Sequence, residues 1–445
     1  MNQAYYSGIS GVMTYQQGLD VVSDNIANVN TVGFKGSTAE FADLLTQSLG
    51  SIGKTPTSND IGLGSRLQST TVQMQNGSLL PSERFNDLAI SGNGWFGVAS
   101  GKETYYTRAG NFVFDTYQQI AGDKNSSVAR LTTTDGKYVT GTMLTNYAYE
   151  SAFDYGDKTV NGTTGAYVVN NPTNAAELKG VASQGKLEFP TRLAYPVEPT
   201  KKAQFFGNLP PDHQTHTISA DVISGNNDRN RLKLTFTQSA VQPSTGIAWD
   251  VTATVTSNDG SIVYDTQSGQ AIFDGSGGLS SCTIKSMNND GQQVAVDLGS
   301  SFNGVISVDG LAASGSSRSD GVSGGVLTKY GINSNGVIVA DFSNGRQSAI
   351  GRIAIYHFQN DQGLNRIGDT EFQESSGSGK PLFWTDKSGN VITGAIVNSG
   401  QLENSNVHLD VGLTDMIIMQ RAYQANAKII TTGDELVQKA LQMHR

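Results

Sequence analysis

The sequence predicts a multidomain, mainly β protein with terminal α-helices that form a coiled-coil-like core, and with nested β domains between them. Three observations lead to this prediction. Apolar residues recur every seven positions at both ends of the chain, which is typical of helices that pack on other helices. Short apolar runs separated by glycine-rich turns fill the interior. The chain has 52 glycines and only 16% charged residues, which favours a turn-rich β interior.

The first predicted element is a helix over residues 2–29, with Gly33 as a plausible stop. Glycines inside it each cost about 1 kcal/mol relative to alanine, so we expect it to fold only against a partner. An adjoining stripe on this helix consists of Tyr15, Val22 and Val29. The heptad positions, which we expect in the helical core of an assembly, are Tyr5, Val12, Leu19 and Ile26.

The last predicted element is one long helix over residues 402–445, and we assign 407–445 to the helical core domain together with residues 1–29. Asn404, Ser405 and Asn406 are candidate N-caps. The alternative is that this segment is simply the amphipathic last helix of a globular core. Leu413, Ala427 and Leu441 fall beside the heptad row. The heptad positions expected in the assembly core are Leu409, Met416, Tyr423, Ile430 and Val437.

Between the helices, the sequence predicts a connecting region over residues 30–76 and two β domains, one nested inside the other. The inner β domain comprises 77–206 and 325–406, and the outer β domain comprises 207–324. In the inner domain, LAISGNGWFGVA and then YYTRAGNFVFD each predict a β-hairpin. In the outer domain, segments such as RLKLTFTQS and AWDVTATVTS alternate as strands at regular spacing. Residues 47–64 of the connecting region predict a loop with possible strand pairing.

Charge and composition exclude several classes of protein. A net charge of −9 argues against a nucleic-acid partner, because phosphate recognition needs a basic surface. No window approaches the apolar length of a membrane span, and the N-terminus lacks the basic and apolar regions of a Sec-type signal peptide, so we expect no membrane insertion. The single cysteine, Cys282, predicts a small buried hydrophobe rather than a redox group.

No catalytic constellation is evident, and we expect neither an enzyme nor a cofactor or metal site. His213 and His216 have a conceivable metal spacing, but a solvated loop is the simpler interpretation. The glycine-rich runs lack the Lys-Ser/Thr pair of a phosphate-binding loop or a following βαβ unit. Arg108 is interpreted as a structural charge near a turn. A secreted β-rich enzyme or carbohydrate-binding protein is the rival class, and it would require an acid pair or an aromatic platform.

Three long segments resemble the bacterial flagellar axial proteins, the rod and hook family. SGISGVMTYQQGLDVVSDNIANVNTVGFKGSTAEFADLL resembles the start of these proteins. QNGSLLPSERFNDLAISGNGWFGV followed by YYTRAGNFVFD is similar to the beginning of their shared β domain. LENSNVHLDVGLTDMIIMQRAYQANAKIITTGDELVQKAL, above all QRAYQANAK, resembles their terminal helix. The segments occur in the family's order, which makes the resemblance specific.

The resemblance implies a mechanical protein that polymerises with itself into a helical tube. The terminal helices, residues 1–29 and 409–445, would line an export channel. The inner β domain would form the wall and the outer β domain the surface. It further implies export by the flagellar type III apparatus to the extracellular flagellum, and contacts with the distal rod protein, the hook cap protein and the hook–filament junction protein. Length and the middle module favour the curved, torque-transmitting hook. Residues 47–64 are similar to an insert of distal rod proteins, which keeps a basal-body rod subunit as the alternative.

Overall fold

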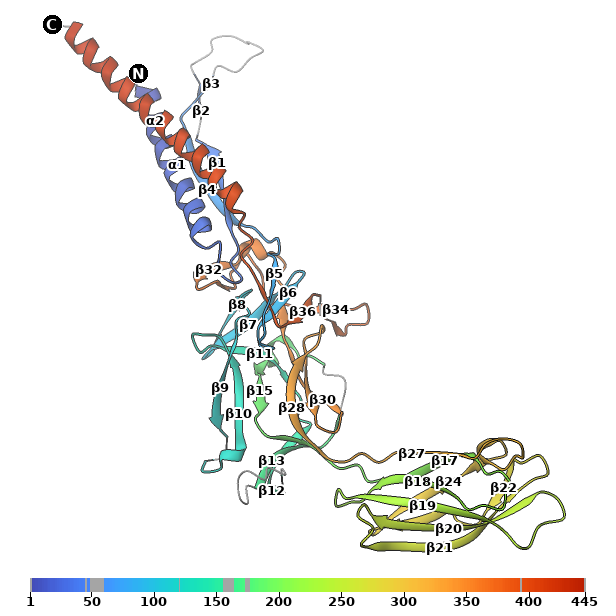
Figure 1. Cartoon of the computed structure of the whole chain (residues 1–445). Coiled ribbons are helices and arrows are strands. Elements are labelled where there is room, and N and C mark those ends of the chain that lie inside the picture. The colour runs from blue at the N-terminus through green and yellow to red at the C-terminus, as the bar shows by residue number, and fades with distance from the viewer. Residues whose placement is uncertain are drawn as a thin grey trace.

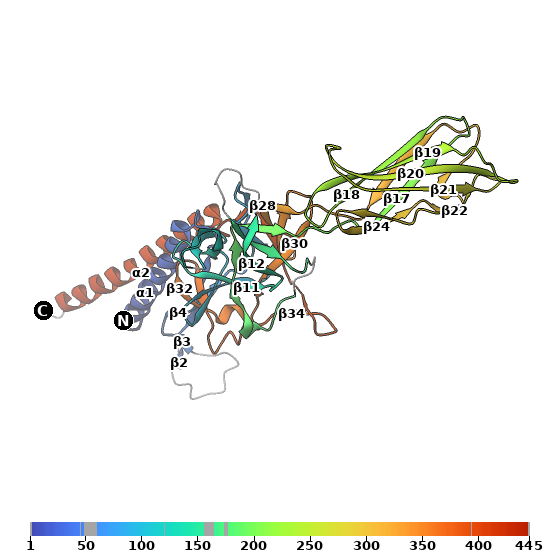
Figure 2. The ribbon, with the colours of Figure 1, turned by 90° about the horizontal axis from the view of Figure 1, so that it is seen from below.

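The computed structural model describes residues 2–44, 46–48, 60–119, 121–154, 164–172, 177–392 and 394–443. The molecule is elongated, with a pair of helices at one end, a β region in the middle and a second β region set off at an angle at the other end (Figures 1 and 2). The predicted fold class is confirmed: within the described residues the two α-helices are terminal, and strands make up most of what lies between them.

The two helices lie side by side and antiparallel. α1 spans Asn2–Ala27 and α2 spans Leu409–Met443. They meet along the glycines of α1, because a Cβ atom added at Gly11 would lie 2.5 Å from Oδ1 of Asn426, and one at Gly18 would lie 2.8 Å from Sδ of Met419. The glycines that weaken α1 alone therefore permit the close approach of α2. Neither helix is both long and apolar enough to cross a membrane.

The apolar pattern predicts a helix from residue 402, and this start is wrong, whereas the start at Leu409 that the resemblance implies is confirmed. Residues Gln401–Glu403 form strand β37, which pairs with β5, Leu79–Pro81, and places Leu402 opposite Leu80. The side chain of Asn406 bonds the backbone of residues 36, 73 and 75 and does not cap the helix. The first turn of α2 instead closes from the amide of Gly412 to the carbonyl of His408. Long-range strand pairing thus takes these residues from the helix.

An antiparallel arm follows α1. Strand β1, Ser37–Asp43, pairs with β4, Ser65–Val72, and β2, Thr46–Ser48, pairs with β3, Asp60–Gly62. The predicted strand pairing within 47–64 is present where that stretch is described, and residues 49–59 lie outside the described residues. The arm packs on α1, since Oγ1 of Thr14 donates to the carbonyl of Ser65 at 2.9 Å.

The middle region is a large, mostly antiparallel sheet built from both halves of the chain. Its core includes Leu88, Phe96, Phe112, Phe189 and Ile350. Two short pairs, β5 with β37 and β6 with β36, join the first residues of the region to the last, and β34 pairs with β35. The strands of the sheet are β7 (Trp95–Ser100), β8 (Glu103–Thr107), β9 (Val113–Gln118), β10 (Ser127–Thr132), β11 (Tyr138–Met143), β12 (Tyr147–Asp154), β13 (Thr164–Val169), β14 (Gly185–Lys186), β15 (Glu188–Pro190), β16 (Leu193–Tyr195), β28 (Gly325–Ile332), β29 (Val337–Phe342), β30 (Gln347–Ile353), β31 (Ile355–Tyr356), β32 (Asn365–Gly368) and β33 (Glu371–Gln373). The short pairs add β6 (Leu88–Ser91), β36 (Ile396–Ser399), β34 (Trp384–Thr385) and β35 (Val391–Ile392), and single 3-10 turns cover Lys124–Ser126, Val181–Ser183 and Asp361–Gly363.

Both hairpins predicted in this region are wrong. β6 and β7 flank the Gly-Asn-Gly turn, but β6 pairs with β36 and β7 pairs with β8, β11 and β31. Likewise β8 pairs with β7 and β33, whereas β9 pairs with β10. Strands from the second half of the chain compete for these edges. Local turn chemistry therefore marks where the chain bends without fixing which strands pair.

The second β region is a two-sheet sandwich with its own core, which includes Phe205, Phe236, Trp249, Phe273 and Met287. Burial alternates along its long strands, as expected when one face of each sheet is covered by the other. One sheet contains β18 (His216–Ile223), β19 (Arg229–Gln238), β20 (Ile247–Ser257), β21 (Val263–Phe273) and β22 (Leu279–Cys282). The other contains β17 (Lys202–Asn208), β23 (Ser286–Asn289), β24 (Gln292–Asp297), β25 (Gly299–Ser300), β26 (Asn303–Ile306) and β27 (Ser314–Ser319).

Candidate assembly surface and its root

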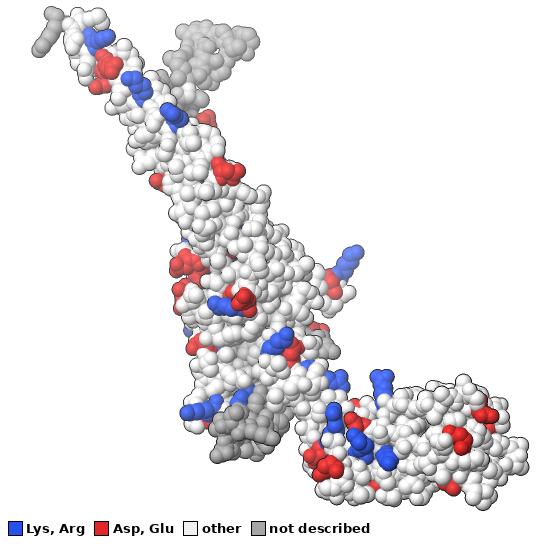
Figure 3. Space-filling model, in the orientation of Figure 1, with Lys and Arg blue, Asp and Glu red and all other residues white. Residues whose placement is uncertain are grey.

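Apolar side chains lie uncovered along the helix pair. No residue of α2 over Leu409–Met443 is buried by its own chain. A contiguous apolar surface of this kind marks a site that another molecule covers. Figure 3 shows only a sparse row of charged side chains on the visible face of this pair. The exposed large apolar residues of α2 are Leu409, Val411, Leu413, Ile417, Ile418, Tyr423, Ile429, Leu436, Val437, Leu441 and Met443.

The nine predicted assembly positions divide into an exposed group and a half-buried group. Ile26 and Ile430 lie within the pair itself, because they are the side chains nearest to Gly412 and Gly8 of the opposite helix. The buried apolar residue of α1 is Val22, from the adjoining stripe and not from the heptad row. Tyr5, Leu409, Tyr423 and Val437 are exposed. The half-buried positions are Val12, Leu19, Ile26, Met416 and Ile430.

A shallow apolar groove runs between the free ends of the helices. Tyr5 of α1 forms one side, and Ile429 and Leu436 of α2 form the other. The small residues Ala425 and Gly433 leave the floor open. An apolar side chain seated there would remove its own surface and these walls from water, at about 25 cal/mol per Å².

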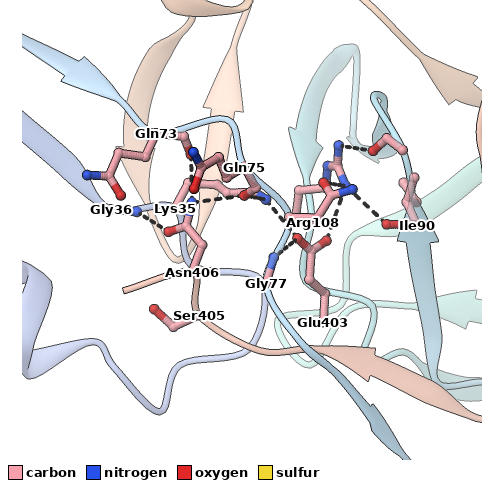
Figure 4. A network of polar contacts seen from close by, with 12 residues as sticks. Lys35, Gly36, Gln73, Gln75, Gly77, Ile90, Arg108, Glu403, Ser405 and Asn406 are labelled. Carbon is pink, nitrogen blue, oxygen red and sulfur yellow. Dashed lines mark hydrogen bonds and ion pairs between the residues drawn. The ribbon is translucent and has the colours of Figure 1, made fainter. Parts of the chain in front are cut away.

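At the root of the helices, three charged side chains are buried together (Figure 4). Nζ of Lys35 lies 2.7 Å from Oε1 of Glu403, and Nη1 of Arg108 lies 3.2 Å from Oε2 of the same carboxylate. The side chains of Lys35, Glu403 and Arg108 are 1%, 0% and 3% exposed, so water screens these ion pairs very little. We call these residues the root triad.

Backbone groups supply further hydrogen bonds to the root triad, although Nε of Arg108 has no partner among the described residues. Lys35 also donates to the carbonyl of Gln75 at 2.7 Å, and Arg108 donates to the carbonyls of Ile90 and Gly92 at 3.2 and 2.7 Å. The amide of Gly77 donates to Oε1 of Glu403 at 3.0 Å. Burial lowers the pKa of Lys35 and of Arg108, while the charge of Glu403 opposes that shift for both.

Asn406 adds an uncharged part to the root. Its Oδ1 accepts from the amide of Gly36 at 2.8 Å, and its Nδ2 donates to the carbonyls of Gln73 and Gln75 at 2.7 and 2.9 Å. In Figure 4 these contacts continue the row formed by the triad. The segments leading out of α1 and into α2 are therefore fixed to the same place.

Sequence reasoning found only part of this root. Arg108 lies after β8, close to the turn where a structural charge was predicted, but it is buried in an ion pair. Lys35 and Glu403 were missed, although charged residues beside Phe34 and Leu402 are uncommon in so weakly charged a chain. A charge next to an apolar residue was the signal that could have found them. The two residues lie 368 positions apart, so only the fold shows that they meet.

The histidines and the cysteine considered in the sequence lie in ordinary surroundings. His216 contacts Asp212 at 2.9 Å, while His213 occupies a left-handed turn with φ of 58°. Among the residues described, no group of three His, Cys, Asp or Glu side chains is placed to hold a metal ion. Cys282 is half-buried in β22, and burial raises the pKa of its thiol.

Three family models match separate parts of the chain. Residues 6–35 match the flagella basal body rod protein model, and residues 89–187 match the flagellar hook protein FlgE/F/G D1 domain. Residues 398–443 match the flagellar basal body rod FlgEFG protein C-terminal model. The first and last matches include Lys35 and Glu403, and the middle match includes Arg108, so the root triad draws one residue from each.

Several proteins that match this chain over nearly its whole length are flagellar hook proteins. The flagellar hook protein FlgE of Borreliella burgdorferi is 29% identical to this chain, and the match covers 100% of both. Proteins of the same name from Treponema pallidum and Salmonella typhimurium are each 28% identical, with 100% and 98% of both chains covered. Among solved structures, Helicobacter pylori flagellar hook protein FlgE2 is 16% identical with a TM-score of 0.48, covering 73% of this chain and 100% of that one.

Proposed function

Because this chain belongs to the bacterial flagellar rod and hook protein family, we propose that it is a structural subunit of the flagellar hook and assembles with copies of itself into a helical tube. The observation that carries the proposal is α2, a helix of 35 residues with none of them buried by its own chain. Helices with apolar heptad rows pack against other helices, and in the part of the chain that the structure describes α1 is the one other α-helix. Neighbouring copies would cover the rest.

The proposed arrangement follows the long axis of the molecule. The helix pair would lie innermost and enclose the export channel, the β region around Phe96 would form the wall, and the sandwich around Trp249 would lie outside (Figure 1). Burial of an exposed leucine or isoleucine contributes about 1.5–3 kcal/mol, so several such residues per subunit suffice to hold a polymer. Tyr5, Val12, Leu19, Ile26, Leu409, Met416, Tyr423, Ile430 and Val437 are proposed as the helical core of this assembly.

The proposed partners follow from the place of a hook in the flagellum. Copies of the chain itself are the main partner, with the distal rod protein below, and the hook cap protein and hook–filament junction protein above. Delivery through the flagellar type III export apparatus to the outside of the cell completes the proposal. The family assignment and the exposed helix surface support it.

An assembly assay tests the proposal. We expect the wild-type chain to form tubes visible by electron microscopy, and the Tyr423→Asp variant to form none at the same concentration, because an unpaired carboxylate would be buried between helices. Val241→Asp is the matched control, since Val241 is an exposed apolar residue of the β19–β20 loop, 79% exposed. Tubes from Tyr423→Asp, or equal loss in the control, would contradict a helical core.

The arm supports a second candidate, a rod subunit, because a paired hairpin projecting beside α1 can stiffen a tube wall by contacting a neighbour. The two candidates differ in tube shape. We expect curved tubes from the intact chain and straighter tubes after residues 199–321 are replaced by a short linker. Straight, rigid cylinders from the intact chain would favour the rod assignment.

A further inference from the structure

The root triad joins three segments that are far apart in the chain. Lys35 lies on the segment leaving α1, Arg108 follows β8 of the middle sheet, and Glu403 ends β37 shortly before α2. Each of the two ion pairs therefore crosses from one segment to another. Backbone contacts strengthen the same meeting point, because the amide of Gly33 donates to the carbonyl of Glu403 at 2.8 Å.

The charges at this point tolerate only one arrangement of the three segments. Two cations share one carboxylate, and both also donate to backbone carbonyls. Arg108 donates to Oδ1 of Asn76 as well, and its Nε is buried without a hydrogen-bond partner in the described part of the chain. Displacing the Glu403 segment would leave Lys35 and Arg108 buried without a counter-charge, which is costly in a site closed to water. A purely apolar contact would lose far less free energy if the segments rotated slightly relative to one another.

Neighbouring contacts reinforce this selectivity. Arg366 from the β32–β33 hairpin lies over the ring of Phe34, with its guanidinium carbon 4.8 Å from the ring centre, and donates to the carbonyl of Lys35. It also lies 3.7 Å from the carboxylate of Asp24 near the end of α1. Arg366 thus connects the end of the first helix and the segment up to residue 35 to the middle sheet.

We propose that the root triad is a coupling joint that fixes the direction of the helix pair relative to the middle sheet, with Glu403 as the positioning residue for both helices. A subunit whose helices already point in the bound direction loses less orientational freedom when it joins a polymer. Only this consequence for the polymer rests on the proposed function. The joint itself is a property of the single chain.

Hydrogen exchange on the full-length, unpolymerised chain tests the joint directly. In Glu403→Gln, we expect exchange at the amides of Gly33, Gly36 and Gly77 to rise at least tenfold, while β10 and β11 keep their wild-type protection. Glu374→Gln is the matched control, because its ion pair with Lys380 at 2.7 Å is exposed, and it should change none of these amides. Unchanged exchange at the three glycines in Glu403→Gln would overturn the proposal.

A second variant separates charge from packing. Lys35→Met combined with Glu403→Gln leaves one buried cation in place of two, so it should exchange more slowly at Gly77 than Glu403→Gln alone. If the triad only fills space, the effects of the two substitutions on exchange add, and the double variant exchanges faster at Gly77. That result would contradict a joint set by charge.

Polymerisation gives the last readout. We expect Glu403→Gln to need about tenfold more protein than the wild type to form tubes, with Glu374→Gln unchanged. Equal concentrations for Glu403→Gln and the wild type would overturn the coupling role in assembly. If the wild-type chain forms no tubes, the proposed function fails, while the exchange experiment on the single chain still decides the joint.

Discussion

The two joints of this molecule are built in opposite ways. At the root of the helices, buried ion pairs and the Asn406 contacts join several segments through groups closed to water, and the partly exposed β5–β37 pair adds backbone pairing. Between the middle sheet and the outer sandwich, the chain crosses twice, and the crossings share one isolated bridge, Glu198 with Val322. The ion pair beside that bridge, Arg346 with Glu198 at 3.8 Å, is about half exposed.

The hydrophobic cores show the same contrast. The core of the middle sheet and the core of the sandwich share no residue among those described, and the crossing segments near Glu198 and Val322 belong to neither. Rotation at this outer joint disturbs little buried surface, whereas rotation at the root separates buried charges. We therefore expect the root to hold one direction of the helix pair. We expect the outer joint, where the amide of Gly324 also donates to Oδ1 of Asn227 at 2.7 Å, to yield more easily.

The largest expected effect is at the root. Replacing Arg108 by Met leaves the carbonyls of Ile90 and Gly92 without their donor and removes one counter-charge of Glu403. Breaking a buried pair costs about 3–5 kcal/mol. We expect calorimetry to show a lower melting temperature for the middle sheet and the sandwich transition in its wild-type place. A shift of both transitions together would show that the outer joint is not thermodynamically independent.

Phe236→Ala sharpens the comparison from the other side. Phe236 is fully buried in the sandwich core. Replacing a buried phenylalanine by alanine costs about 3–5 kcal/mol, and the cost is lower when neighbouring side chains move into the cavity. Only the sandwich transition should move in the same calorimetric scan. Hydrogen exchange in β19 and β20 should rise, and exchange at Gly77 beside the root should stay at the wild-type rate.

A much smaller effect is expected at the outer joint. Arg346→Ala removes a half-exposed ion pair, and surface pairs contribute about 0–1 kcal/mol. Chemical denaturation should give the wild-type midpoint within error for both β regions. A loss comparable with that of Arg108→Met would mean that the outer joint is as firmly held as the root.

The smallest effect depends on pH. The Lys202 ammonium, then Gln204 and the amide of Gly299, lower the pKa of Asp297 from 3.8 to about 2. Because the folded pKa is lower than the unfolded one, this carboxylate stabilises the sandwich above about pH 4, and the contribution disappears as the pH falls towards 2. Asp297→Asn should therefore reduce sandwich stability slightly at pH 7 and have no effect near pH 2. Equal destabilisation at both pH values would contradict this role.

The sequence predicted local features better than long-range ones. Heptad rows identified both helices, because a period of seven is visible within each segment. The inward-facing Gly11 and Gly18 of α1 lie one residue before the heptad positions Val12 and Leu19. They were not predicted as contact positions, since glycine gives no hydrophobic signal although it allows close helix contact. The apolar pattern alone placed the start of α2 too early, because β37 pairs with β5, a contact across more than three hundred positions.

The candidate site shows the same limit. Tyr423 and Val437 were predicted from an apolar row that can be recognised without a structure, and both are exposed. Their place in an assembly core stays a prediction. Lys35 and Glu403 were not predicted, because ordinary charged residues become informative only when the fold buries them together. The hairpins failed for a related reason, as β6 and β7 each found a distant partner.

We expect the helix pair and the middle sheet to turn as one body in the assembled tube. We expect the sandwich to turn independently about the Glu198–Val322 bridge. Electron cryo-microscopy of the assembled tubes, with subunits sorted by their position around the curve, measures both angles. We predict that the direction of α2 relative to the middle sheet is the same in every class and that the sandwich angle varies between classes. A constant sandwich angle with a varying helix direction would contradict the claim.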